Sequence, residues 1–293
     1  MNTDDSRDNW DKKFAGINLR VVVPLFAYVL VGSAELTSTY LDVRVGILIH
    51  LLFLFTLLIL SSLLYRESIR TRSHSLRKAW QIEDMSYLLN ALILIPLIGL
   101  IRFSMPLEAV ERIYWFSIIG IPLFLAIILL IRHMKMQLRD VGLVSNFSLT
   151  QFFIALTGVL FGFCEYLILK PVLSEGMILK PGVFIDELTP INLAISCFIL
   201  MIFSGLLEEL TFRGIVQTKA EAVVGRNAGL FLSSILFMLM HIGFKSTPDM
   251  IFVFLVGFFY GYVFQKTRSL WGITLSHGIT NIVLFLIAPF FFS

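Results

Sequence analysis

Three short groups of polar residues interrupt otherwise apolar sequence in the last third of the chain. They occur in the segments LLEELTFRG, FMLMH and HGITN, and their members are Glu208, Glu209, Arg213, Phe237, His241, His277 and Asn281. A carboxylate or an imidazole can take a proton from water, and imidazole or amide N–H groups can stabilise a developing oxyanion. These residue types therefore suit hydrolytic chemistry.

Spacing within these groups indicates which side chains meet. Residues four positions apart share one face of a helix, which predicts an ion pair between Glu209 and Arg213. Glu208 lies about 100° round the same helix and has no local cationic partner. Its partner must therefore come from another helix of the bundle. His241 and His277 are the titratable residues on nearby apolar helices that could be this partner.

A purely structural interpretation exists for each piece. A single histidine or glutamate within a membrane commonly hydrogen-bonds neighbouring helices. Glu209 and Arg213 can neutralise each other without further function. Phe237, which we expect to stack on His241 one turn later, is also an ordinary core residue. Five further residues carry no motif and receive no assigned role: Glu35, Glu165, His50, His74 and His133.

The elements that must position these groups are transmembrane helices. Hydrophobic residues make up 57% of the 293 residues, and apolar stretches near the roughly 20 residues of a spanning helix recur along the chain. The sequence predicts an all-α, polytopic helical bundle of eight or nine spans. The expected spans are 19–39, 45–65, 86–103, 113–131, 149–170, 190–210, 227–244, 249–266 and 270–289.

The basic residues indicate an orientation. With the N-terminus in the cytoplasm, seventeen of the 23 Lys and Arg residues fall on the inner side, including five between Arg66 and Asp84. The positive-inside rule thus predicts a multi-pass cell-membrane protein with a cytoplasmic N-terminus and a cytoplasmic loop at 66–84.

The polar N-terminal segment does not resemble a removable signal peptide. A net charge of +3 gives no indication of a nucleic-acid-binding surface. Cys164 and Cys197 have no partner motif and are expected to be packing residues.

Together the three groups resemble the CPBP family of intramembrane proteases, the CAAX prenyl protease and bacteriocin-processing family, also called Abi. The family pattern EExxxR, FxxxH and HxxxN is met at Glu208 to Arg213, Phe237 to His241 and His277 to Asn281. The resemblance covers roughly residues 190–285. It suggests a division into an N-terminal transmembrane scaffold, 1–185, and a catalytic helical core, 186–293.

The resemblance implies a role for each motif residue. Glu208, assisted by His241, would activate water, and His277 with Asn281 would stabilise the oxyanion of the attacked peptide bond. Glu209, Arg213 and Phe237 would support them. Helix geometry agrees, because a glutamate paired with arginine is a poorer base than one desolvated among apolar helices.

Cofactor and substrate stay open at this stage. Family members are usually described as metalloproteases, and Glu208, His241 and His277 are a possible zinc ligand set of the His₂Glu type; the same residues suit a metal-free glutamate mechanism. The implied partners are membrane lipid and a peptide or membrane-protein substrate, such as a prenylated CAAX tail, a leader peptide or a bacteriocin. The alternatives are a non-catalytic scaffold or immunity protein of the same fold, and a transporter.

The helix lengths predict that the motif residues lie at different depths in the membrane. Glu208 and His241 lie roughly 25 Å from a turn near Gly225, whereas His277 lies only about 10–15 Å from the preceding loop. We expect the helix of Glu208 to run past residue 210, the Thr211 to Gly225 segment to project beyond the membrane, and the site to lie near the cytoplasmic side.

Overall fold

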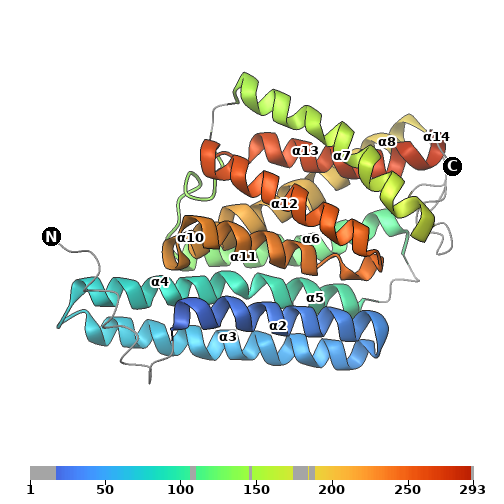
Figure 1. Ribbon diagram of the computed structural model, residues 1–293. Helices are drawn as coiled ribbons and strands as arrows, with labels where there is room; N and C mark the ends of the chain where they lie inside the picture. Colours follow the sequence, from blue (N-terminus) through green and yellow to red (C-terminus); the bar gives the residue numbers. More distant parts are fainter. Residues whose placement is uncertain (1–17, 106–109, 145–146, 174–183, 185–188, 292–293) are drawn as a thin grey trace.

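The computed structural model describes residues 18–105, 110–144, 147–173, 184 and 189–291 (Figure 1). Within these ranges the chain is helical and has no strand. Nine helices in this part of the chain are long and apolar enough to cross a membrane. The prediction of an all-α, multi-pass bundle is therefore confirmed.

The first five spans lie close to their predicted ranges. They are α2 (Leu19–Tyr40), α3 (Val43–Thr71), α4 with α5 (Leu76–Leu92 and Leu94–Ser104), α6 (Arg112–His133) and α7 (Leu149–Leu173).

The sixth span runs without interruption from Pro190 to Val224, so the helix of Glu208 does extend past residue 210. It consists of α8 (Pro190–Leu200), a π-helix (Met201–Leu206), α9 (Leu207–Glu209), a second π-helix (Leu210–Gln217) and α10 (Thr218–Val224). The last three spans are α11 (Arg226–Leu239) with a 3₁₀ turn (Ile242–Phe244), α12 (Thr247–Thr267), and α13 (Trp271–Ile282) continued by a π-helix (Val283–Ile287) and α14 (Ala288–Phe291).

Figure 1 shows the helices stacked in layers. The N-terminal helices α2 to α5 form one layer, drawn in blue to teal at the bottom of the view. Helices α10, α11 and α12 lie next to it, and α7 and α13 lie on the far side. Contacts of α11 with α2 and of α10 with α4 join the first two layers. The C-terminal helices are thus enclosed by α2–α5 on one side and α7 on the other.

Local sequence signals set the short turns between spans. The Asp42 side chain accepts hydrogen bonds from the backbone N–H groups of Arg44 and Val45 at the start of α3, and Ser246 caps α12 in the same way. Such caps satisfy backbone donors that a helix start leaves unpaired. Gly225, between α10 and α11, has φ 93°, a conformation that glycine adopts without strain. These turns let consecutive helices pack antiparallel.

Small residues bring α7 against α13. A side chain at Gly162 would meet the Thr280 carbonyl oxygen at 2.6 Å, and one at Gly158 would collide with the Ser276 backbone. Glycines four residues apart allow close approach of two helix backbones in a membrane. This contact fixes α13, which carries His277, against a helix that the sequence motifs do not include.

The two ends of the bundle can be distinguished by the residues that lie at each of them. At one end, the Arg268 guanidinium pairs with Glu221 at 2.6 Å, and the Lys219 ammonium lies 5.1 Å from the ring of Tyr87. The connections Thr71–Leu76, His133–Leu149 and Thr267–Trp271 lie at this end, which we call the basic end. At the other end, the Lys245 ammonium lies 5.7 Å from the ring of Tyr40. We call that the Tyr40 end.

One expectation about a polar segment is wrong. The predicted loop from Arg66 to Asp84 is helical except for a short turn, because α3 continues to Thr71 and α4 begins at Leu76. Projection of the Thr211 to Gly225 segment beyond the membrane stays a prediction; within the bundle, α10 packs on α4 and α11, and Glu221 pairs with Arg268. Buried contacts along this segment, including Gln217 with the Gly261 carbonyl at 3.0 Å, hold it within the bundle.

Some predictions fall outside the described residues. They concern the N-terminal basic residues Arg7, Lys12 and Lys13, the loop residue Lys180, and the division between residues 185 and 186.

Candidate active site

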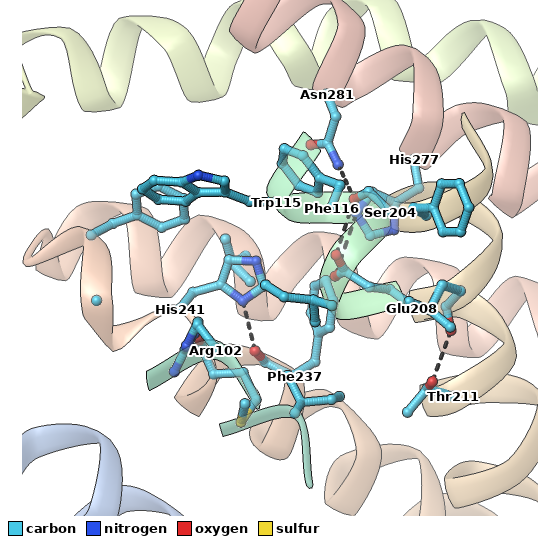
Figure 2. Close-up of a pocket in the computed structure, with 18 of the residues that line it drawn as sticks. Arg102, Trp115, Phe116, Ser204, Glu208, Thr211, Phe237, His241, His277 and Asn281 are labelled. Atoms are coloured by element: carbon cyan, nitrogen blue, oxygen red, sulfur yellow. Dashed lines mark hydrogen bonds and ion pairs between the residues drawn. The ribbon is translucent and has the colours of Figure 1, made fainter. Parts of the chain in front are cut away.

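A pocket of about 540 Å³ opens among the helices that carry the three motifs (Figure 2). Glu208, His241, His277 and Asn281 all line it. The remaining wall is largely apolar and includes the aromatic residues Phe103, Trp115, Phe116, Phe184, Phe203, Phe212, Phe237, Phe244, Phe252, Tyr260 and Phe285. The structure therefore brings together the four residues that the sequence singled out for chemistry, in an apolar cavity.

A fully buried carboxylate, Glu209, connects two of the motifs. Its Oε1 accepts a hydrogen bond from Arg213 Nη1 at 2.8 Å and lies 2.7 Å from His277 Nδ1. The side chains of Glu209 and Arg213 are both completely buried. The predicted pair is present, and its second partner, His277, was not predicted. Because the arginine-bound carboxylate can only accept, Nδ1 of His277 carries a proton.

Phe237 packs against Arg213 of this ion pair and against both histidines of the motifs. The Arg213 guanidinium lies 4.5 Å from its ring centre, and its ring centre lies 4.7 Å from that of His241 and 5.8 Å from that of His277. The predicted contact of Phe237 with His241 is present, but the rings are tilted at 55° and not stacked. Arg213 also donates to the Gly257 carbonyl at 2.9 Å, so the pair is tied to α12 as well.

Glu208 points away from this ion pair and into the pocket. Its side chain is 27% exposed, and its Oε2 lies 3.8 Å from His277 Nε2. Its Oε1 accepts a hydrogen bond from the Ser204 hydroxyl at 3.0 Å. Ser204 in turn accepts from Asn281 Nδ2 at 2.6 Å, as Figure 2 shows. Adjacent glutamates thus occupy different environments: Glu209 is surrounded by partners, and Glu208 faces the cavity.

His241 follows the last turn of α11, where its ring is held by the helix itself. Its Nδ1 lies 2.8 Å from the Phe237 carbonyl oxygen. A carbonyl only accepts, so Nδ1 donates and the neutral ring presents an unprotonated Nε2. His241 interacts electrostatically with both Glu208 and His277. The ring nitrogen that remains available is therefore suited to accept a proton.

The π-helical turns explain how Glu208 and His277 reach one depth. Glu208 lies 13 residues before Glu221, and His277 lies nine residues after Arg268, which pairs with Glu221. In ideal α-helices these paths would differ by roughly 6 Å. The π-helix Leu210–Gln217 lies in the longer path, and its wider i→i+5 turns advance less per residue. The sequence carries no signal for this feature.

The pocket reaches one end of the bundle. His241 lies two residues after the end of α11, and the wall includes Val43, Arg102, Arg112 and Phe244. All of these belong to the Tyr40 end. The expected position of the site near the cytoplasmic side of the membrane stays a prediction.

Several residues that touch the site lie outside the motifs. Ser204 joins Glu208 to Asn281, and Glu165 on α7 is a buried pocket residue that interacts electrostatically with Glu208. Arg102 lines the pocket from α5. A signal was available for Glu165 and Arg102, since charged residues in apolar spans are costly; Ser204 offered none.

The donor atoms do not form a metal site. In the part of the chain that the structure describes, no three His, Cys, Asp or Glu side chains are arranged to hold a metal ion. The ligand set Glu208, His241 and His277 therefore does not fit a metal as placed.

Comparison with known families agrees with the motifs. Residues 190–283 match the family described as type II CAAX prenyl endopeptidase Rce1-like. The match includes all seven motif residues and leaves out the helices α2 to α7. No curated protein and no solved structure matches the chain.

Two ion pairs of the bundle, Arg213–Glu209 and Arg268–Glu221, provide a matched test of burial. Arg213→Met leaves Glu209 buried without its cation, and breaking a buried pair in this way costs roughly 3–5 kcal/mol. Arg268→Met removes a pair whose arginine side chain is 49% exposed, where a loss of at most about 1 kcal/mol is expected. Thermal unfolding of the purified variants in detergent should show a much larger loss for Arg213→Met. Equal losses would contradict a structural role for the buried pair.

Proposed function

We propose that this multi-pass membrane protein, whose residues 190–283 place it with the Rce1-like CAAX prenyl endopeptidases, is an endopeptidase that hydrolyses a peptide bond within the membrane. The observation that carries the proposal is the contrast between the adjacent glutamates. Glu209 is occupied by Arg213 and His277, while Glu208 faces the cavity beside two histidines and an amide. A general base needs such a free carboxylate within reach of water.

In the proposed reaction, Glu208 takes a proton from water as the water oxygen bonds to the carbonyl carbon of the substrate. His241 Nε2 assists by accepting a hydrogen bond from the same water. The carbonyl becomes a tetrahedral oxyanion. When the C–N bond breaks, the proton held by Glu208 passes to the leaving amine. The products are a new carboxylate and a free amino group, and the enzyme returns to its starting state.

His277 and Asn281 are the proposed oxyanion donors. Asn281 gives one N–H to Ser204 and retains a second. His277 already donates from Nδ1 to Glu209, so it must be an imidazolium to donate from Nε2 as well. The carboxylate of Glu209, 2.7 Å from Nδ1, supplies the counter-charge that such a cation needs. Donors fixed in advance are effective because they need not reorganise in the transition state.

The pocket suits an apolar peptide segment. Its wall is mostly apolar and rich in aromatic residues, and about 540 Å³ can enclose several side chains. Burial of apolar groups there would supply binding energy of about 25 cal/mol per Å². We propose a membrane-associated peptide or protein as substrate, with the surrounding lipid as its route of access.

Replacement of Glu208 tests the proposal. Glu208→Gln keeps the shape and the Ser204 contact but cannot accept the proton, so turnover should fall by about 10²–10⁴-fold while substrate still binds. The purified protein would be incubated in detergent with a peptide library, and products identified by mass spectrometry. Glu165→Gln, another pocket carboxylate outside the motifs, is the matched control and should retain activity. Cleavage by Glu208→Gln at the wild-type rate would contradict the role of the base. Absence of cleavage by the wild-type protein would favour a non-catalytic scaffold.

We also propose that the N-terminus and the basic end face the cytoplasm, which follows from the positive-inside rule. The Thr71–Leu76 turn belongs to that end, and Ser73 within it is exposed. A Ser73→Cys variant in which Cys164 and Cys197 are replaced should resist an impermeant thiol reagent in intact cells and react after lysis. Leu41→Cys, in the turn at the Tyr40 end, should show the reverse pattern. Labelling of Ser73→Cys from outside would invert the topology.

A further inference from the structure

Three charged or polar residues of the N-terminal helices form a buried network that the family match does not cover. They are Glu35 on α2, His50 on α3 and Arg102 on α5. Glu35 and His50 are completely buried, and the Arg102 side chain is 27% exposed. Ionisable groups within an apolar bundle are costly. The presence of three such groups at one place therefore indicates a functional role.

Glu35 connects the other two members of this network. One guanidinium nitrogen of Arg102, Nη2, donates to Glu35 Oε2. The other carboxylate oxygen, Oε1, lies 3.3 Å from His50 Nε2. The Arg102 guanidinium also lies 4.5 Å from the ring centre of Phe103. Arg102 is thus held by Glu35 on α2, which His50 approaches from α3.

The remaining guanidinium nitrogen of Arg102 reaches the catalytic region. Its Nη1 donates a hydrogen bond of 2.9 Å to the backbone carbonyl of Met240, the residue before His241. Met240 is the C-cap of α11, where the last carbonyls have no partner within the helix and favour a nearby cation. Figure 2 shows Arg102 beside His241 at the pocket wall. The same turn of α11 supplies the Phe237 carbonyl that fixes the His241 ring.

We infer that Arg102, held by Glu35, is a positioning residue for His241. It holds the carbonyl next to His241, so the imidazole keeps the orientation in which Nε2 faces the pocket. The N-terminal helices would then contribute to catalysis through this one contact. The catalytic part of the inference rests on the proposed peptidase function; the positional part does not.

A second pocket arginine separates positioning from simple charge. Arg112 lines the same pocket and is half-buried, and its guanidinium lies 5.9 Å from the Trp115 ring. Among the described residues, no carboxylate lies within ion-pair distance of it, and no hydrogen bond joins it to α11. Arg112→Met therefore removes a positive charge from the pocket without releasing Met240.

Two variants release Met240 in different ways. The double variant Glu35→Gln with Arg102→Met removes the anion and the cation together, so no buried charge is left alone. Arg102→Lys keeps the charge, but an ammonium lacks the planar fork that bridges Glu35 and Met240. If the double variant fails to fold, Arg102→Lys provides the test.

The readout combines kinetics with the His241 ring. The chain has five histidines, so ¹⁵N-histidine labelling gives few ring signals, assigned by single substitutions. We expect the double variant and Arg102→Lys to shift or broaden the His241 ring signals and to lower kcat by about 10- to 100-fold, the effect of a small misplacement. KM should stay within about twofold, and Arg112→Met, which changes the pocket wall but not the Met240 contact, should leave the His241 ring signals unchanged.

The outcomes are distinguishable. Unchanged His241 signals and kcat in a folded double variant would overturn the inference. An inactive wild-type protein would instead overturn the proposed function, and the His241 signals alone would then decide the positioning role. Equal changes in Arg112→Met and in the double variant would show that pocket charge matters and not the Met240 contact, which also overturns the inference.

Discussion

A single buried carboxylate, Glu209, organises the C-terminal half of the structure. It accepts from Arg213 within its own helix and from His277 on α13. Arg213 extends the connection to α12 through the Gly257 carbonyl and to α11 through the Phe237 ring. Four helices thus meet around one ion pair, which is costly to bury unless every charged group is satisfied. Glu208, the residue before Glu209, lines the pocket beside this cluster.

The division of labour between Glu208 and Glu209 follows from that cluster. Because Glu209 is committed to Arg213 and His277, the adjacent carboxylate is turned toward the cavity, where Ser204 and His277 approach it. A lone carboxylate pair at the same depth would repel, and the arginine prevents this by neutralising one of them. The same ion pair that stabilises the fold therefore leaves one glutamate available for chemistry.

Much of this arrangement could be predicted from the sequence, because it depends on local spacing. The i,i+4 separation predicted the Glu209–Arg213 pair and the Phe237–His241 contact, and hydropathy predicted the spans. Contacts between distant helices could not be predicted so well. Ser204 has no neighbouring motif, and Glu35 and Arg102 are separated by 67 positions. The π-helical turns leave no mark in composition, so the assumed α-helical rise did not account for the meeting of Glu208 and His277.

The central claim is that Glu208 activates water and forms no covalent bond with the substrate. Single-turnover cleavage in H₂¹⁸O tests it most directly, with enzyme in excess and both product and enzyme analysed by mass spectrometry. The account predicts one ¹⁸O atom in the new carboxylate of the product and an unlabelled Glu208. Label in the Glu208 carboxylate, with none in the product, would reveal an acyl-enzyme intermediate and contradict the proposed role of Glu208.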